Sequence, residues 1–183
     1  MKKIAILLEN GFEEIEAIIP IDVLRRLDFD IVLAGKNIKI TGAHNINIDA
    51  DCLIDELNAD NLDAIILPGG LPGSTNLRDN PKVISLVSEM HKAGKLVSAI
   101  CAAPIALQKA DIMKNKKCTG YPMPMLKDAL KDADYTAERV ETDGNIITAK
   151  GPGASFEFAV AIASYLGKKP QAHTLMKNMF QKI

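Results

Sequence analysis

Short apolar runs alternate along the chain with longer segments in which apolar residues recur every three or four positions. The runs have the length of buried strands and cover residues 4–8, 29–33, 63–67 and 96–100. The helical spacing covers residues 13–27, 81–93, 102–110, 155–166 and 171–181. Strands that alternate with helices predict an α/β protein with a mostly parallel sheet covered on both faces.

Local signals place several of these boundaries. Asn80 as a cap and Pro81 in the first turn predict the start of one helix, and Gly94 predicts its end. The pair Asp143-Gly144 lies between the strand-like segments 139–142 and 145–149 and predicts a hairpin. Pro20 predicts a kink or a restart in the first helix.

Other segments give weaker signals. Residues 36–53 fit a small antiparallel excursion or an irregular connection, residues 117–119 a short strand, and residues 123–129 a helix. Ser155 is a candidate helix cap, and Lys168-Lys169-Pro170 is expected to break the helix before it. The chain shows no internal repeat or linker, so residues 1–183 are expected to form a single domain.

Composition narrows the class of protein. The charges nearly cancel, with 22 Lys and Arg against 23 Asp and Glu, so neither nucleic acid nor a membrane surface is an expected partner. The run after Met1 is too short for a signal peptide, and a cytoplasmic location is expected. Three cysteines without CxxC spacing suggest reduced thiols and no metal site. No cofactor is expected, since the glycines at 69–70 lack the residues of a phosphate loop.

Cys101 is the main candidate for chemistry. It directly follows the strand 96–100 and precedes a helix, and the residues two positions away, Ala99 and Ala103, are small. This arrangement is typical of a nucleophile elbow, in which a tight turn presents the reactive side chain. The helix after it is expected to favour the thiolate. The alternative is an inert cysteine that packs as a small apolar residue.

Glu16 lies on an apolar helix face beside Phe12, Ile19 and Pro20. A carboxyl group that is buried there would have a raised pKa and could donate a hydrogen bond to a sulfur anion. The alternative is a partly exposed side chain with its carboxyl group in water. For Glu13 and Glu14, interaction with the helix dipole is a sufficient role.

Two glycine-containing loops and three histidines complete the list of candidates. Gly69-Gly70 follows a strand and can supply free backbone N–H groups as an oxyanion hole, or can form only a tight turn. Gly151-Pro152-Gly153 is interpreted as a structural turn. His44, His91 and His173 are interpreted as surface or packing residues, so a triad protease is disfavoured.

Five ordered motifs extend over nearly the whole chain, and together they resemble the ThiJ/PfpI superfamily, especially the branch of the Parkinson-disease protein and its bacterial ThiJ/YajL-like relatives. The motifs are Gly11-Phe12-Glu13-Glu14-Ile15-Glu16, Ile21-Asp22-Val23-Leu24-Arg25-Arg26, Leu67-Pro68-Gly69-Gly70, Ala99-Ile100-Cys101-Ala102-Ala103-Pro104 and Gly151-Pro152-Gly153-Ala154-Ser155-Phe156-Glu157-Phe158. The resemblance implies a flavodoxin-like three-layer sandwich and a homodimer.

The resemblance also implies roles for individual residues. Cys101 would be the reactive thiol, Glu16 its protonated partner, and the N–H groups of Gly70 and Ala102 the oxyanion site. By analogy, Arg26 would line a pocket on the dimer side. Activities in the superfamily include glutathione-independent glyoxalase, deglycase repair of glyoxal-type adducts on proteins, peroxide sensing and chaperoning.

Two departures from the superfamily pattern bear on function. Tyr121 stands in a segment where many relatives have histidine, and it can donate a hydrogen bond or serve in packing. Ala102 stands where PfpI-type peptidases have histidine directly after the cysteine. A peptidase, an amidotransferase or a role in thiazole biosynthesis is therefore a remote alternative.

Two hypotheses remain from the sequence. In the first, Cys101 adds to the aldehyde of methylglyoxal or of glyoxal-type adducts, with Glu16 moving the proton, so that the substrates are small aldehydes or glycated proteins. In the second, oxidation of Cys101 makes the protein a redox sensor or chaperone.

Overall fold

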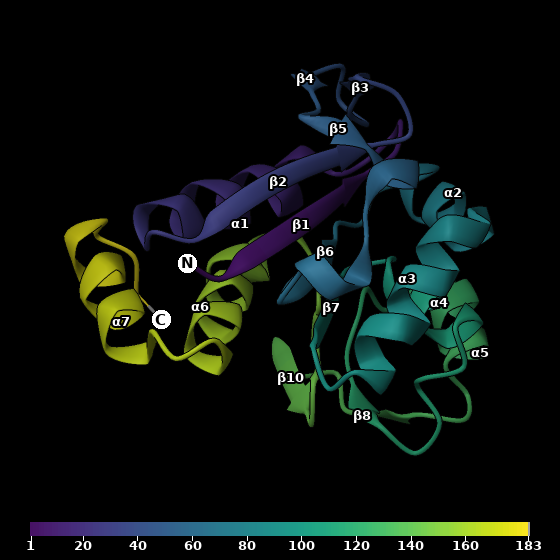
Figure 1. Ribbon diagram of the computed structural model, residues 1–183. Helices are drawn as coiled ribbons and strands as arrows, with labels where there is room; N and C mark the ends of the chain where they lie inside the picture. The colour runs from purple at the N-terminus through teal and green to yellow at the C-terminus, as the bar shows by residue number, and fades with distance from the viewer. Residues whose placement is uncertain (183) are drawn as a thin grey trace.

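A seven-stranded sheet forms the middle layer of the protein in the computed structural model, which describes residues 1–182 (Figure 1). The order across it is β10-β11-β7-β6-β1-β2-β5. Neighbouring strands are parallel except for the pair β10 and β11, so the expected mostly parallel sheet is confirmed. The strands are β1 (Lys3–Leu8), β2 (Asp30–Gly35), β5 (Cys52–Leu53), β6 (Ala64–Leu67), β7 (Leu96–Ile100), β10 (Val140–Asp143) and β11 (Ile146–Ala149).

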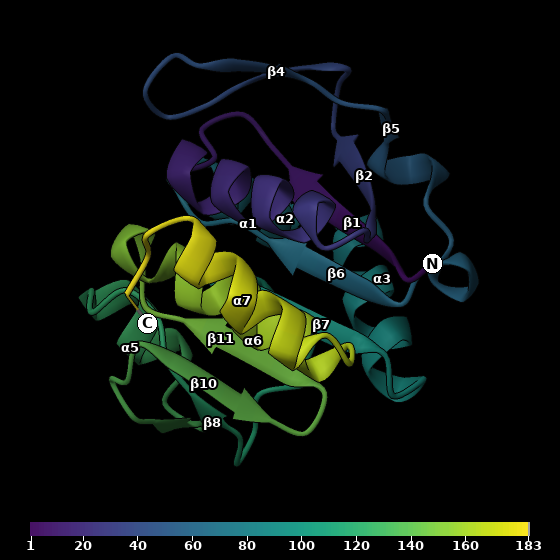
Figure 2. The ribbon, with the colours of Figure 1, turned by 90° about the vertical axis from the view of Figure 1, so that its left-hand side faces the viewer.

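Helices cover both faces of this sheet. On one face α1 (Glu14–Arg26) packs against α6 (Ser155–Tyr165), and α7 (Lys169–Asn178) packs on α6 (Figure 2). The other face carries α2, α3, α4 and α5, whose buried residues form a second apolar cluster with the sheet. Their bounds are α2 (Gly73–Asp79), α3 (Pro81–Lys92), α4 (Pro104–Lys109) and α5 (Pro124–Ala129).

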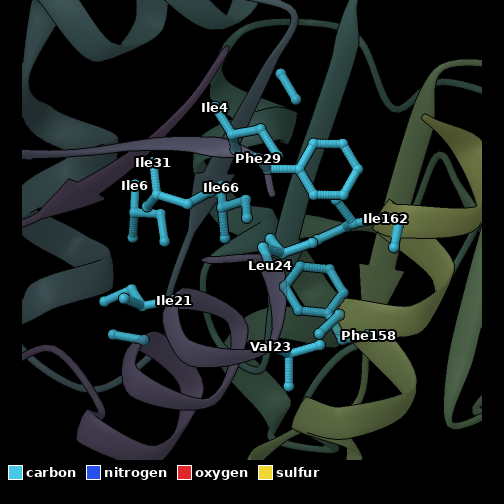
Figure 3. Close-up of a cluster of buried hydrophobic side chains, with 14 of the residues drawn as sticks. Ile4, Ile6, Ile21, Val23, Leu24, Phe29, Ile31, Ile66, Phe158 and Ile162 are labelled. Carbon is cyan, nitrogen blue, oxygen red and sulfur yellow. The ribbon is translucent and has the colours of Figure 1, made fainter. Parts of the chain in front are cut away.

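The central strands are buried on both sides, which explains their continuous apolar sequence. In β1, Ile4 and Ile6 belong to the cluster under α1 and α6, whereas Ala5 and Leu7 belong to the opposite cluster. Figure 3 shows this cluster, with Ile4 and Ile6 from the sheet on one side and Val23 of α1 and Phe158 of α6 on the other. Burying this apolar area provides the main driving force for folding, at about 25 cal/mol per Å².

Several boundaries follow the local sequence signals. The side chain of Asn80 accepts a hydrogen bond from the N–H of Lys82 at 3.0 Å, and Pro81 opens α3. Gly94 has a φ of +69°, as a residue that ends a helix often does. The hairpin at Asp143-Gly144 is also confirmed, with β10 and β11 antiparallel.

The helices differ from the expectations at several boundaries. Helix α1 continues through Pro20 without the restart that was one of the two alternatives, because its buried face holds it against the core. Ser155 is the first residue of α6 rather than its cap, and its hydroxyl donates to the carbonyl of Pro152 at 2.8 Å. Helix α6 ends before Lys168-Lys169-Pro170, as expected, but α7 begins at Lys169 and not at Gln171. Helix α2, a largely polar helix whose main apolar anchor is Leu77, was not expected from the sequence.

The smaller elements lie outside the sheet layer. Strands β3 (Lys39–Thr41) and β4 (Asn47–Asp49) form an antiparallel hairpin, which was one of the two alternatives for residues 36–53. Strand β8 (Lys117–Cys118) confirms the short strand expected at residues 117–119. Its parallel partner, β9 (Asp134–Tyr135), was not predicted from the sequence. The remaining elements are three 3-10 turns, η1 (Ile54–Glu56), η2 (Ala59–Asn61) and η3 (Pro152–Ala154). Within residues 1–182, no helix combines the length and apolar character that spanning a bilayer would require.

Candidate active site

Cys101 lies at the turn between β7 and α4, at the edge where the parallel strands β1, β6 and β7 all end. Its φ is +64°, in the left-handed region that residues other than glycine rarely adopt. Two neighbouring segments hold this backbone: the N–H of Cys101 donates to the carbonyl of Ala149 at 2.9 Å, and its carbonyl accepts from Tyr121 N–H at 2.8 Å. Strain of this kind is common at functional sites, where the surroundings fix it.

Glycines at positions 69 and 120 allow two neighbouring segments of the chain to approach Cys101 closely. A Cβ atom on Gly69 would lie 2.6 Å from the Cβ of Cys101 and would collide with the carboxyl group of Glu16. A Cβ atom on Gly120 would lie 2.8 Å from the carbonyl oxygen of Cys101. Ala99 and Ala103 are fully buried, as expected for the small residues around an elbow.

Glu16 is fully buried in the first turns of α1, directly beside this turn. Its Oε2 accepts a hydrogen bond from the N–H of Gly69 at 2.8 Å, whereas Oε1 has no hydrogen-bond partner within the described part of the chain. Burial raises the pKa of Glu16 to about 7, although interactions with Cys101 and the Gly69 N–H oppose the shift. Glu16 is therefore a carboxyl group that can hold or release a proton near neutral pH.

The thiol of Cys101 is coupled to this carboxyl group. Burial raises the pKa of Cys101, the negative charge of an ionised Glu16 raises it further, and the N–H groups of Gly70 and Ala102 lower it. The backbone N–H of Ala102, in the turn that leads into α4, lowers the pKa of the thiol as expected, but burial and the charge of Glu16 outweigh this effect. A thiolate here depends on a proton remaining on Glu16, so the two groups titrate as a pair.

A cavity of about 290 Å³ opens above Cys101. Its walls come from five segments that meet at this edge of the sheet. The lining residues are Glu13, Gly70, Leu71, Cys101, Ala102, Tyr121, Met123 and Pro152. The interpretation of Gly151-Pro152-Gly153 as only a structural turn was therefore incomplete, since Pro152 forms part of this wall.

The structure brings together most, but not all, of the candidate residues. Cys101, Glu16, Gly70, Ala102 and Tyr121 meet at or directly beneath the cavity. Arg26 does not, because it lies in the last turn of α1 and lines a different cavity of about 480 Å³ next to α7. Its guanidinium pairs with Asp22 at 2.8 Å.

Sequence reasoning missed a second buried carboxylate. Glu14 accepts hydrogen bonds from the backbone N–H of His44 at 2.7 Å and from the His44 ring at 2.8 Å. These contacts tie the hairpin of β3 and β4 to α1, so His44 is more than an ordinary surface residue. A possible signal was Gly42, since a side chain there would collide with the Glu14 carboxylate.

Glu13, Glu14 and His44 also place ligand atoms within 4.8 Å of one another. The Glu14 oxygens already accept hydrogen bonds, and the side chain of His44 is 67% exposed, so we interpret the cluster as an ion pair. His91 lies on α3 and His173 on α7, away from the residues that line the Cys101 cavity.

Comparison with known proteins identifies the family. The model of the DJ-1/PfpI family matches residues 2–165. The chain belongs to the DJ-1/PfpI family. This confirms the resemblance to the ThiJ/PfpI superfamily inferred from the sequence motifs.

Individual DJ-1 proteins are similar over different fractions of their length. The chain is 34% identical to Protein dj-1beta of Drosophila melanogaster over 181 residues, which cover 97% of this chain and 96% of that protein. It is 36% identical to Protein DJ-1 homolog A of Arabidopsis thaliana over 93% of this chain, but it spans only 44% of that longer protein.

Solved structures of DJ-1 proteins confirm the fold. The crystal structure of a cysteine-to-alanine mutant of a DJ-1 superfamily protein from Salmonella typhimurium superposes with a TM-score of 0.93 at 34% identity, and each chain is covered completely. The flavodoxin-like α/β fold expected from the sequence is thus confirmed.

Proposed function

We propose that this DJ-1/PfpI protein is an enzyme of carbonyl stress that converts methylglyoxal, or glyoxal-type adducts on proteins, through Cys101 and Glu16. The observation that carries the proposal is the buried Glu16, whose pKa is raised to about 7 directly beside Cys101. A group that is to move protons at neutral pH needs a pKa in this range. The cavity of about 290 Å³ is of a size that suits small carbonyl compounds.

The residues support a complete reaction without an added oxidant or reductant. The sulfur anion of Cys101 attacks the aldehyde carbon, and Glu16 gives its proton to the carbonyl oxygen, which forms a hemithioacetal. The ionised Glu16 then takes a proton from the former aldehyde carbon, which gives an enediol-type intermediate, and returns it to the neighbouring carbon. The hydroxyl proton of the hemithioacetal passes to the oxygen of that neighbouring carbon, so that the former aldehyde carbon becomes a thioester carbonyl and its neighbour becomes an alcohol. Water finally hydrolyses the resulting thioester, which releases lactate and restores the pair.

Backbone N–H groups assist where negative charge develops. Those of Gly70 and Ala102 interact with the Cys101 thiol and lower its pKa, and both residues line the cavity. An oxyanion that forms on a carbon bonded to this sulfur lies within reach of the same donors. Gly70 has a φ of +88°, and a side chain there would collide with the backbone of Glu13, so this position requires glycine.

The decisive test measures lactate production from methylglyoxal. We expect Cys101→Ser to lower kcat/KM by about 10³-fold or more, because the hydroxyl is a far weaker nucleophile than the thiolate. Cys52→Ser is the matched control, since Cys52 is a half-buried cysteine on the edge strand β5 and should retain wild-type turnover. Full turnover by Cys101→Ser would show that the proposal is wrong.

A second function, redox sensing by Cys101, is supported by the unpartnered Oε1 of Glu16. Attack of the thiolate on hydrogen peroxide forms a sulfenate and water, and a second peroxide converts it to a sulfinate. A protonated Oε1 could then donate a hydrogen bond to a sulfinate oxygen. Peroxide treatment followed by peptide mass spectrometry should show two added oxygens on Cys101 before Cys52 or Cys118; equal oxidation of all three would contradict this function.

Assembly into a homodimer also remains a prediction. Ile15 and Ile18 are more than 40% exposed on α1, and Ile46, whose N–H contacts Glu14, is 52% exposed on the neighbouring hairpin. Such a group of exposed isoleucines fits an interface with a second copy. Sedimentation should show a dimer for the wild type and a monomer for Ile18→Glu; an unchanged dimer would exclude this face as the interface.

A further inference from the structure

A second cavity, also of about 290 Å³, adjoins the cavity above Cys101. The two cavities share Tyr121 and Pro152 as walls. The remaining walls of the second cavity come from Pro122, Arg139, Lys150 and the segment 151–154. Tyr121 and Pro152 therefore stand between the two cavities, and a molecule held by its carbonyl group at Cys101 would have to pass these two residues to reach the second cavity.

The two cavities differ in charge. The charged residue that lines the Cys101 cavity is Glu13, whereas those that line the second cavity are Arg139 and Lys150. Arg139 is already neutralised, since its guanidinium pairs with Glu157 at 2.6 Å and also donates to the carbonyl of Gly153. It is therefore not free to bind an anion without losing this ion pair.

Lys150 differs from Arg139 in the partners of its charged group. Its ammonium group donates to the carbonyl of Ala137 at 3.0 Å, and across residues 1–182 no carboxylate lies within 4.0 Å of it. Lys150 is half-buried, and the carbonyl that its ammonium group contacts belongs to the exposed residue Ala137, so the charge is accessible to solvent. The segment 151–154 that lines the same cavity leads into the first turn of α6, whose positive dipole end adds to the potential.

The backbone fixes Lys150 next to the reactive cysteine. Ala149, the preceding residue, accepts the N–H of Cys101 at 2.9 Å, and β11 pairs with β7 up to this point. The ring of Tyr121 lies against Gly151, where an added Cβ would be 3.3 Å from it. The distance between the backbone of the elbow and the backbone of Lys150 is therefore set by the sheet.

We propose that Lys150 forms an anion subsite, so that the preferred substrates are small carbonyl compounds that carry a carboxylate or phosphate group at the end away from the carbonyl. This inference rests on the proposed function and specifies its substrate class. The carbonyl carbon would meet Cys101, and the anionic group would receive a charge-assisted hydrogen bond from Lys150. Lys150 would thus determine specificity and would take no part in the chemical steps.

The test uses alkylation of Cys101, which does not depend on turnover. The rates of reaction with 3-maleimidopropionate, which is anionic, and with N-ethylmaleimide, which is neutral, are measured at Cys101 by peptide mass spectrometry. We expect the ratio of the anionic to the neutral rate to fall about fivefold in Lys150→Gln and to be retained in Lys150→Arg. Lys127→Gln, which removes an exposed lysine on α5, is the matched control and should keep the wild-type ratio.

Each outcome decides the proposal. An unchanged ratio in Lys150→Gln, or an equal fall in Lys127→Gln, would overturn the subsite. If the ratio no longer depends on Lys150 in 0.5 M salt, this result would support the subsite, because the interaction is electrostatic. If methylglyoxal is not converted but the ratio still depends on Lys150, the proposed enzyme activity fails and the anion subsite stands. Carboxylate and phosphate are then distinguished by the protection that succinate and inorganic phosphate give against the anionic maleimide.

Discussion

Glu14 and Glu16 stand two residues apart on α1, and both are buried, yet their carboxyl groups have opposite properties. Burial tends to raise the pKa of Glu14, but hydrogen bonds from the ring and backbone of His44 and from Ile46 lower it below its ordinary value. Burial raises the pKa of Glu16 to about 7, because few donors oppose it. The deeper burial of Glu16 and the larger number of donors around Glu14 together decide which glutamate holds its proton.

The difference separates a structural from a chemical role. Glu14 is a fixed anion that ties the hairpin of β3 and β4 to α1. Glu16 has an unpartnered oxygen and a neighbouring thiol, so its proton can move. An unsatisfied buried oxygen costs stability, and such a cost is common where a site is used for chemistry.

The largest effect should come from exchanging each carboxyl group for an amide. Glu16→Gln keeps the shape but cannot transfer a proton, so we expect kcat/KM for methylglyoxal to fall by about 10²- to 10³-fold. Glu14→Gln should change kcat/KM far less, because the Glu14 carboxylate binds His44 and Ile46, whereas Glu16 interacts with Cys101. Steady-state kinetics of both variants measure this contrast, and equal losses would show that the two residues do not differ in role.

The contributions of Glu16 and Glu14 to the free energy of unfolding should depend on pH in opposite directions. The pKa of Glu16 is raised in the fold, so the stability contributed by its protonated form is present below its ordinary pKa of 4.5 and is lost as the pH rises through about 7. The loss is about 3 kcal/mol for a shift of this size. Glu16→Gln should remove this part of the slope in urea unfolding between pH 4.5 and 8. A slope identical to that of the wild type would mean that Glu16 keeps an ordinary pKa.

The contribution of Glu14 to the free energy of unfolding should increase with pH, opposite to that of Glu16. Its pKa is lowered in the fold, so its contribution is present above its ordinary pKa and is lost as the pH falls through the lower folded value. We therefore expect Glu14→Gln to lower the free energy of unfolding by about 1–3 kcal/mol at pH 7, with a smaller loss in acid. Urea unfolding at the two pH values measures the difference, and a loss that grows in acid would contradict the assignment.

The smallest expected effect concerns His44. Its hydrogen bond to Glu14 raises the pKa of the imidazole above its ordinary value, and the charge of Glu13 adds to this. In Glu14→Gln the pKa of His44 should move back toward the ordinary value, as measured by NMR titration of the ring protons. His173, on α7, serves as an internal control in the same spectra. No movement of the His44 titration would show that the contact with Glu14 does not persist in solution.

Elements with strong local signals could be predicted from the sequence. Asn80, Pro81 and Gly94 bound α3 because capping and backbone preferences act within a few residues. The hairpin at Asp143-Gly144 and the elbow at Cys101 have the same local origin. Glu16 could be chosen because its neighbours on the helix face are apolar, which the spacing of residues reveals.

Features that depend on contacts between distant segments could not be predicted. Helix α2 has too few apolar residues to show a period, and α1 remains continuous at Pro20 because it packs against α6. The pairing of Glu14 with His44 joins residues 30 positions apart, and the close approach of Gly42 to Glu14 becomes evident only in the folded chain. Arg26 was assigned to a pocket by resemblance, and within this chain it lies at the other end of α1 from Glu16.

The sequence by itself determined the order of strands and helices, the elbow cysteine and the glutamate on an apolar face, since each depends on neighbours along the chain. Only the tertiary structure decided how many donors reach each carboxyl group and which cation beside the second cavity has no carboxylate partner among residues 1–182. Those donors and partners come from segments that meet at one edge of the sheet. The proton affinity of Glu16 and the free charge of Lys150 are therefore properties of the assembled fold, because electrostatic interactions depend on distance and burial in space and not on separation in sequence.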